Sequence, residues 1–317
     1  MTGSIGIALA SGLLSSLLFL SLAKGFAAGM LLSYLAPLPL MMVGLHRGLA
    51  AALVAGLAAM AAVAAVAGGL SSLPFAIMAV LPSLVVVRQA LLCRSDSAGN
   101  VEWYPPGLVL GWLTALGVAL ILVGAALVPE QPAGGEMGGV QAWVADMIGK
   151  TMSLLAPTLT DEQRKMALDW WVPFFPAMLA GSWLVMAIVN AVSAQGFLVR
   201  LGRSQRPTPV YRKLELPVWL GVVLAAAFAA GAVAEGDLGY LARSITAVTL
   251  IPFALLGLAA MHGWAANRPS ARILLAVMYG VLFLASAWAF VPVAGLGLVR
   301  FMTRFRRSAD GGDGKEK

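Results

Sequence analysis

Long apolar runs alternate with short polar breaks along most of this chain. From Ile5 to Arg300 one unit repeats: an apolar run about as long as a membrane helix, then a few polar residues. A run of about 18 or more apolar residues matches a bilayer, whereas a buried helix of a water-soluble protein has about 10–14. The pattern therefore predicts helices that lie in lipid.

The apolar runs divide the chain into nine segments, and we expect each of them to be helical. Within a bilayer every backbone N–H and C=O must be bonded inside its own segment, and the alternating pattern of a membrane barrel is absent. The predicted fold class is an all-α, polytopic transmembrane helical bundle, with one membrane domain over residues 1–307 and a disordered cytoplasmic tail over 308–317. The segments are Ile5–Ala23, Gly29–Leu45, Leu49–Gly68, Leu73–Leu92, Gly107–Val128, Phe174–Val199, Pro217–Ala234, Ile245–Ala265 and Ile273–Val299.

Charge asymmetry predicts the orientation. If the N-terminus is cytoplasmic, most basic residues of the short loops lie inside and most acidic residues outside, as the positive-inside rule requires. The first segment has the length of a secretory signal, but no Lys or Arg precedes it, so we expect a retained helix.

The ninth segment is too long for one upright crossing. As one helix, Ile273–Val299 would be about 40 Å long, against a hydrocarbon core of about 30 Å. We favour a helical hairpin or re-entrant pair that bends near Pro292 and returns the basic tail to the cytoplasm. The alternative is one long tilted helix with an external tail.

The second segment contains two prolines that favour a broken helix. Pro37 and Pro39 remove two backbone donors and restrict the residues before them. In transporters such breaks line substrate sites, whereas the alternative is a kinked structural helix. Tyr34 lies beside the break, and Asn190 is the most central polar residue of the sixth segment. The candidate substrate-site residues are Tyr34, Pro37, Pro39 and Asn190.

The external loop over residues 129–169 has order of its own. Apolar residues from Val140 to Leu155 recur at helical spacing, which predicts an amphipathic helix on the outer surface. Thr160 and Gln163 have the spacing of a capping box, so a second helix should begin at Asp161. The first helix would be a plain interfacial helix or, alternatively, a lid over a site between helices.

Composition narrows the function classes. Hydrophobic residues make up 60% of 317 residues and charged residues 11%, with a mean hydropathy of +0.89, which leaves no room for a soluble catalytic domain. The net charge is +7, and the basic residues lie at the ends of apolar runs. We therefore expect them to set the orientation of the helices rather than to bind nucleic acid. The single cysteine, Cys93, excludes an intramolecular disulfide and a cysteine metal cluster. We find no catalytic motif and expect no enzyme, no cofactor and no metal site.

No acidic residue falls inside a predicted segment, which counts against a proton-driven pump.

Two further groups of residues are candidates for contacts with other helices, lipid or a partner protein. Small residues at four-residue spacing would let helices approach closely; they are Ala8, Gly12 and Ser16. A basic loop would orient the chain or, alternatively, bind anionic lipid or a cytoplasmic partner; its residues are Arg200, Arg203, Arg206, Arg212 and Lys213.

Three short motifs occur together in this chain. They are Pro37-Leu38-Pro39-Leu40 followed by Gly44 and Gly48, the run from Gly257 to His262, and a long uncharged last segment that runs into Phe301, Phe305, Arg306 and Arg307. Together they resemble the YybS-like family of bacterial membrane proteins, over most of the chain. That family is distantly similar to the S components of energy-coupling-factor transporters.

S components are six-helix membrane proteins that capture a micronutrient from outside and dock on a partner membrane subunit and ATPases. The resemblance therefore implies a bacterial inner membrane, contact with the lipid bilayer, another membrane subunit and a cytoplasmic ATPase. Ala8 with Gly12 would match the small-x-x-x-small docking motif of their first helix. This chain is longer, has about three additional segments and lacks a vitamin-specific polar set, so no substrate is carried over.

Two functions follow from these patterns. The first is a solute-binding or transport subunit, with a site between segments one to six near Pro37–Pro39 and a polar-lined cavity under the Val140–Leu155 helix. The alternative is a non-transporting scaffold or assembly factor that acts through its basic loop and tail.

Overall fold

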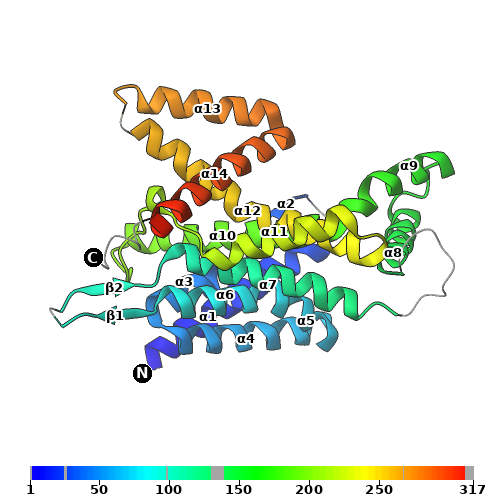
Figure 1. The fold of residues 1–317 in the computed structure, drawn as a ribbon. Helices are drawn as coiled ribbons and strands as arrows, with labels where there is room; N and C mark the ends of the chain where they lie inside the picture. The colour runs from blue at the N-terminus through cyan, green and yellow to red at the C-terminus, as the bar shows by residue number, and fades with distance from the viewer. Residues whose placement is uncertain (1, 25–26, 98, 130–138, 267, 311–317) are drawn as a thin grey trace. The chain divides into compact units, whose positions relative to one another are not determined.

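Helices make up nearly all of the computed structural model, which describes residues 2–24, 27–97, 99–129, 139–266 and 268–310 (Figure 1). The chain forms two compact units. The first contains Met1–Leu113 and Trp183–Glu215, and the second contains Thr114–Ser182 and Leu216–Lys317. The all-α membrane bundle predicted from the sequence is confirmed.

The first unit begins with short helical pieces joined by tight turns. They are α1 (Thr2–Leu20), the 3₁₀ helix η1 (Ser21–Lys24), α2 (Ala27–Tyr34), α3 (Pro37–Arg47), α4 (Leu49–Ala67), η2 (Gly69–Ser71), α5 (Ser72–Phe75), the π-helical turn η3 (Ala76–Val80) and α6 (Leu81–Ala90). A hairpin of β1 (Cys93–Ser95) and β2 (Val101–Trp103) follows, antiparallel with Arg94 opposite Glu102.

Two helices contribute residues to both units, α7 (Pro106–Ala126) and α10 (Phe175–Arg200). The remaining elements are α8 (Gly139–Leu155), α9 (Asp161–Trp171), η4 (Val172–Phe174), η5 (Tyr211–Lys213), α11 (Val218–Val233), α12 (Gly236–Ala266), α13 (Ala271–Ala285), η6 (Ser286–Ala289) and α14 (Phe290–Asp310). Of these, η5 belongs to the first unit.

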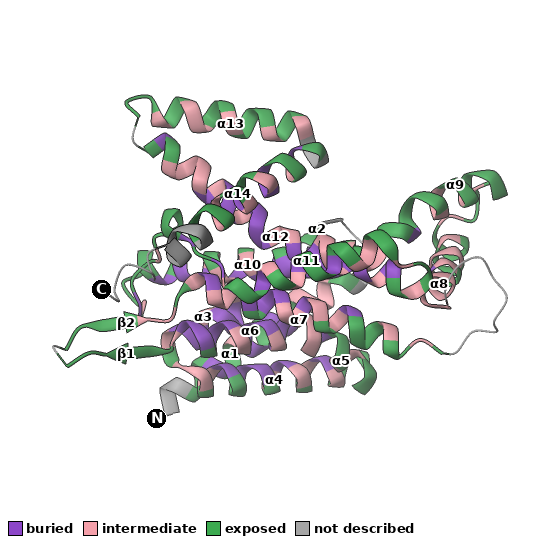
Figure 2. Ribbon diagram, viewed as in Figure 1, coloured by how far each residue is buried: buried purple, intermediate pink, exposed green. Residues whose placement is uncertain are grey.

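Six helical stretches in the described part of the chain are long and apolar enough to cross a membrane. They correspond to predicted segments two to six and eight. Segments one, seven and nine give shorter apolar helices of 10–17 residues. Large apolar side chains remain exposed on many helices, among them Leu57 on α4 and Phe228 on α11 (Figure 2). Apolar surface of this extent is typical of helices that contact lipid.

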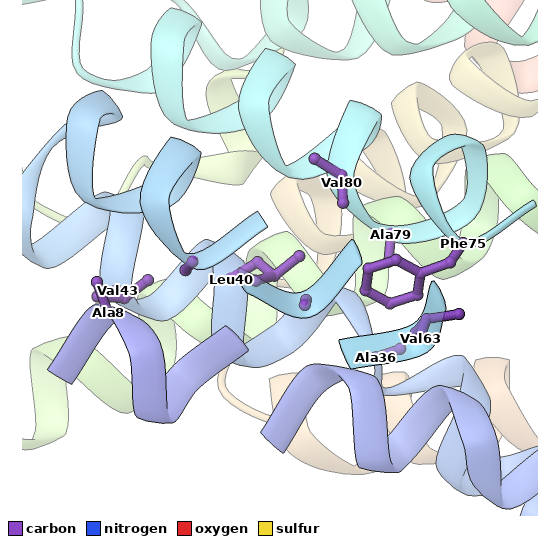
Figure 3. Close-up of a cluster of buried hydrophobic side chains, with 10 residues drawn as sticks. Ala8, Ala36, Leu40, Val43, Val63, Phe75, Ala79 and Val80 are labelled. Carbon is purple, nitrogen blue, oxygen red and sulfur yellow. The ribbon is translucent and has the colours of Figure 1, made fainter. Parts of the chain in front are cut away.

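The core of the first unit is built on small residues. Ala8, Ala36, Ala55 and Ala59 pack with larger side chains that include Phe75 (Figure 3). Gly12 of α1 lies so close to the carbonyl of Ala55 in α4 that an added Cβ would overlap it. Small residues on both helices let the backbones approach, which is how helices pack where lipid removes the hydrophobic drive.

The second unit is centred on α12, which packs against α11 and α14 (Figure 1). Its closest contacts again involve glycine: Gly257 of α12 meets the backbone of Val293, and Gly297 of α14 meets the backbone of Phe253. These contacts join two helices that are separated by a long stretch of chain.

The loop between α7 and α10 contains the two helices that the sequence predicts. Helix α8 covers Gly139–Leu155, and α9 begins at Asp161 with both hydrogen bonds of the Thr160–Gln163 capping box. The first turn of α12 holds this segment. Asp237 accepts from the backbone N–H of Val140 at 2.9 Å, and the Tyr240 hydroxyl donates to the carbonyl of Val172 at 2.7 Å. Residues 130–138, which include Gly134, Gly135 and Gly138, lie outside the described residues.

The ninth segment forms two helices, α13 and α14, joined by the 3₁₀ turn Ser286–Ala289. The bend therefore precedes Pro292, which lies in the first turn of α14. Proline is accepted in a first helical turn because the N–H groups there have no partner within the helix. Whether the tail returns to the cytoplasm stays a prediction. The predicted tail starts within α14, the side chains of Phe305, Arg306 and Arg307 are among those not described, and residues 311–317 lie outside the described residues.

Candidate functional site: a helix break held by buried polar side chains

The second segment is broken between α2 and α3, as the prolines predict. Helix α2 ends at Tyr34 and α3 begins at Pro37, with Leu35 and Ala36 in a turn between them. The N–H groups of Leu35 and Ala36 bond to carbonyls three residues earlier, at 3.0 and 3.1 Å. Since Pro37 and Pro39 have no N–H, the break presents carbonyl oxygens rather than donors.

Side chains from other helices supply donors to these carbonyls. Ser15 of α1 donates its hydroxyl to the Ala36 carbonyl at 2.6 Å. Asn190 of α10 donates through Nδ2 to the Tyr34 carbonyl at 2.8 Å and to the Met186 carbonyl of its own helix at 2.8 Å. In a medium without water each unbonded carbonyl would cost several kcal/mol, so these bonds stabilise the break.

The Asn190 side chain also has a buried oxygen without a hydrogen-bond donor. Its side chain is only 1% exposed, and within the described residues its Oδ1 atom has no hydrogen-bond partner. Turning the amide over would not help, because Oδ1 would then face two carbonyl oxygens. The arrangement thus leaves one buried acceptor on the carboxamide that holds the break.

A π-helical turn lies near the same break. Pro82, the second residue of α6, has no N–H to bond back to the preceding turn, and that turn forms the π-helical η3. The indole of Trp183 in α10 donates to the carbonyl of Ile77 in this turn at 3.1 Å. Ser83 donates to the Ala79 carbonyl at 2.6 Å and lies 3.4 Å from the Pro37 carbonyl. Polar contacts therefore join α6 to α3, and α10 to both α2 and η3.

The basic loop is fixed at a second place in the first unit. Arg206 is buried, and its guanidinium donates to the carbonyl of Ala90 at the end of α6 at 3.0 Å. It also reaches the Tyr104 carbonyl at 3.4 Å and lies over the Trp103 ring, 5.8 Å from its centre. A cation at a helix C-terminus is stabilised by the helix dipole. Burial lowers the pKa of Arg206, and the nearby Tyr211 partly offsets this.

Neutral side chains complete the attachment of this loop. Gln195 of α10 donates to the Ser204 hydroxyl at 2.9 Å and to the Arg206 carbonyl at 3.0 Å. Gln205 donates to the carbonyl of His46, and the His46 ring contacts the Arg203 carbonyl at 2.9 Å. The loop is therefore tied to the ends of α3 and α6.

The predicted site residues fall into three groups. Tyr34 and Asn190 are brought together, but through the Tyr34 carbonyl rather than its side chain; Pro37 and Pro39 are buried at the start of α3. In the basic loop, Arg206 is buried, whereas the exposed members are Arg200, Arg203, Arg212 and Lys213.

The small residues of α1 form the third group. Ala8 and Ser16 are buried, and Gly12 contacts α4 of the same chain. This face of α1 is thus occupied within the first unit, which leaves no open small-residue face there for another subunit. Sequence reasoning missed Ser15, Ser83 and Trp183. Of these, Ser15 directly precedes the predicted Ser16, but only the structure shows that its side chain is buried.

One pocket of about 340 Å³ lies at the hairpin of the first unit. Aromatic and charged side chains line it together, among them Trp103, Tyr104, Arg94 and Glu102. The last two form an exposed ion pair. None of its lining residues belongs to α8, so this pocket is different from the cavity that the sequence predicts under α8. In the described residues no group of three acidic, histidine or cysteine side chains could hold a metal ion.

A known membrane protein family matches most of the chain. A family model described as "Predicted membrane protein (DUF2232)" matches residues 13–299. The chain belongs to this family. No curated protein and no solved structure matches it. The match covers the break, the basic loop and all the candidate spans, and it agrees with the apolar helices in placing the protein in a lipid bilayer.

Proposed function

We propose that this DUF2232 protein is a solute-binding subunit of a membrane transporter, with its site at the α2–α3 break. The single observation that carries the proposal is the Asn190 carboxamide, which is buried, bonded to a carbonyl of a broken helix, and left with one unbonded oxygen. Broken helices at membrane depth are tolerated where protein or a cavity supports them, and in transporters they line the substrate site.

A structural role at this position uses only half of the carboxamide. The Nδ2 atom donates to the Tyr34 carbonyl, which an apolar residue would leave unbonded, but the unpaired Oδ1 atom costs about 1–3 kcal/mol and adds nothing to that role. Polar groups in the interior of membrane bundles are expensive and mark binding sites and pathways. The likeness to S components, which capture a solute and dock on a membrane subunit and ATPases, supports the same proposal by analogy only.

The alternative is a scaffold that acts through its basic loop. In its favour, Arg206 fixes the loop while Arg200 and Arg203 stay exposed. An anchored loop with exposed cations suits an acidic partner or anionic lipid. On this account the protein needs neither a bound solute nor a catalytic site.

A ligand screen on the full chain separates the two functions. The purified protein is heated in detergent with pools of small metabolites, and compounds that raise the unfolding temperature are retested on two variants. Asn190→Leu removes the buried carboxamide at the break. Gln195→Leu is the matched control, because it removes a buried carboxamide from the same helix where the loop attaches.

The proposal predicts a compound that stabilises the wild type and Gln195→Leu but not Asn190→Leu. It also predicts that affinity purification from native membranes recovers an ATPase and a second membrane subunit. A scaffold predicts no stabilising compound, recovery of partners without an ATPase, and loss of those partners when Arg200 and Arg203 are neutralised. That second set of results would overturn the transport proposal.

A further inference from the structure

We infer that the pocket at the β1–β2 hairpin binds a zwitterionic phospholipid headgroup, with the phosphate at Arg94 and a primary ammonium at Glu102. Phosphatidylethanolamine is the lipid class with this headgroup. The pocket shares no residue with the α2–α3 break, so this ligand is independent of the solute proposed there. Three properties of the pocket support it: the position between two spans, the rigid walls and the charges of the lining.

The pocket lies where two candidate spans end. The span Gly69–Ala90 stops just before the hairpin, and the span Pro106–Ala126 begins just after it. Trp103 and Tyr104 of the lining are of the residue types that lie at the headgroup level of a bilayer, and Leu92 contributes apolar surface to the same lining. The molecules that surround a pocket at this level are lipid headgroups.

The aromatic wall is held by contacts with the rest of the first unit. The Arg206 guanidinium lies over the Trp103 ring and donates to the Tyr104 carbonyl at 3.4 Å. The Trp112 indole donates to the Tyr104 hydroxyl at 3.1 Å, and the Tyr104 N–H donates to the Leu92 carbonyl at 2.9 Å. The pocket is thus formed before a ligand arrives, and its volume of about 340 Å³ is in the range of small-molecule sites.

One cation and one anion of the lining face each other across the hairpin. Arg94 of β1 is opposite Glu102 of β2, and two of its guanidinium nitrogens contact Glu102 Oε2 at 2.6 Å. Both side chains are exposed, and such a pair contributes little to stability, so a ligand with both charges can replace it. Opposite positions on paired strands are roughly 5 Å apart, which is close to the separation of the two charges in ethanolamine phosphate.

The same two charges discriminate between headgroups. An anionic headgroup, such as that of phosphatidylglycerol, could pair with Arg94 but would be repelled by Glu102. The choline headgroup has both charges, but its quaternary ammonium has no N–H to donate to the carboxylate. A primary ammonium supplies both the charge and the hydrogen bond. The pocket should therefore prefer ethanolamine to choline and to glycerol headgroups.

Cys93 gives a direct readout, because it lines the pocket, is exposed and is the single cysteine of the chain. The full-length protein is placed in nanodiscs of phosphatidylcholine alone, or with added phosphatidylethanolamine or phosphatidylglycerol. The measured quantity is the rate at which an uncharged, water-soluble maleimide labels Cys93. We expect phosphatidylethanolamine to slow labelling saturably, by about fivefold, and phosphatidylglycerol to leave it unchanged. Equal rates in all three bilayers would overturn the inference.

A double variant locates the headgroup. Arg94→Gln with Glu102→Gln removes both charges without changing the net charge, so the protection by phosphatidylethanolamine should be lost. The matched control is Asp146→Asn with Lys150→Gln, which neutralises another exposed ion pair, on α8, and should keep the protection. Comparing the lipids within each variant cancels any change in the reactivity of the thiol itself. Protection that survives in the hairpin variant would contradict the proposed site.

The single variant Glu102→Gln separates headgroup recognition from a structural role of the hairpin. It keeps Arg94 but lacks the carboxylate that repels an anion. Phosphatidylglycerol should then protect Cys93 at least as well as phosphatidylethanolamine does. A preference for phosphatidylethanolamine that stays unchanged in this variant would overturn the assignment of the ammonium to Glu102.

A soluble fragment distinguishes a lipid from a free zwitterion. Glycerophosphoethanolamine has the same two charges but no acyl chains, and it is added to the protein in phosphatidylcholine nanodiscs. We expect it to protect Cys93 only weakly, since the bilayer holds the lipid at a high local concentration beside the pocket. Protection by the fragment that equals that of the lipid would assign the pocket to a free solute and contradict the lipid site.

Discussion

The two units of the protein differ in how their buried polar side chains are used. In the first unit, buried side chains of one helix donate to backbone carbonyls of another, as Ser15, Asn190 and Trp183 do. In the second unit, the buried Tyr240 hydroxyl donates outside its helix, to Val172, whereas the hydroxyls of Ser244 and Thr246 bond to carbonyls of their own helix, α12. There the close contacts between α12 and α14 are made by glycines against backbone.

The difference follows the interruptions of the helices. Close glycine contacts occur in both units, at Gly12 and at Gly297, because small residues let two backbones approach. Donors aimed at another helix are needed where a helix is broken and its carbonyls lose their partners. The donors between helices of the first unit thus lie where Pro37, Pro39 and Pro82 interrupt regular helices.

The largest effect should come from breaking a glycine contact in the second unit. In Gly297→Ala the new Cβ overlaps the backbone of Phe253, so α12 and α14 must separate, at a cost of about 3 kcal/mol. The unfolding temperature in detergent should fall by several degrees. Gly295→Ala, two residues away with open space around it, should leave the temperature unchanged or slightly raised. Equal losses in both variants would contradict glycine packing.

Arg206 tests the attachment of the basic loop. Arg206→Met keeps the bulk but leaves the carbonyls of Ala90 and Tyr104 without their donor, which should cost about 2 kcal/mol. Trypsin should then cut the loop at Arg212, a site that both variants keep, faster than in the wild type. Arg203→Met is the control, because its side chain is exposed and its contact with His46 uses the backbone carbonyl. If both variants unfold alike, Arg206 is not the anchor.

Ser15 tests the donors at the break. Ser15→Ala removes the hydrogen bond to the Ala36 carbonyl and should lower the free energy of unfolding by about 1 kcal/mol. Ser16→Ala is a matched control on the next residue, since Ser16 is equally buried but bonds to Leu13 in its own helix. Its effect should stay within about 0.5 kcal/mol. The reverse order would show that the break does not depend on α1.

The smallest effect is expected at helices α8 and α9. Thr160→Ala removes the capping box of α9 and should destabilise its first turn by about 1 kcal/mol. Because α9 has no buried residue, the unfolding temperature should barely change. Hydrogen exchange should quicken at Asp161–Arg164 and not in α8. Unchanged exchange would show that other contacts hold this helix start.

Local chemistry explains what the sequence could predict. The capping box depends on two residues three positions apart, and the structure has both of its hydrogen bonds. The break depends on the missing N–H groups of Pro37 and Pro39, and it lies directly before them. Apolar length likewise predicts most spanning helices, because bilayer thickness fixes how many residues are needed.

Contacts between distant segments explain what the sequence could not predict. The partner of Asn190 is a backbone carbonyl 156 residues away, and any residue could supply it. Arg206 has the same charge as its exposed neighbours, and its burial depends on the hairpin at Trp103. Ala8, Gly12 and Ser16 have the spacing of an interface, but only the fold shows that α4 of the same chain occupies it.

A cryo-EM structure of the protein in lipid nanodiscs tests the central claim most directly. The account predicts a turn at Leu35–Ala36, with the Asn190 side chain buried in the bundle and its Nδ2 atom bonded to the Tyr34 carbonyl. A continuous helix from Ala28 to Arg47, or an Asn190 side chain that faces lipid, would contradict it.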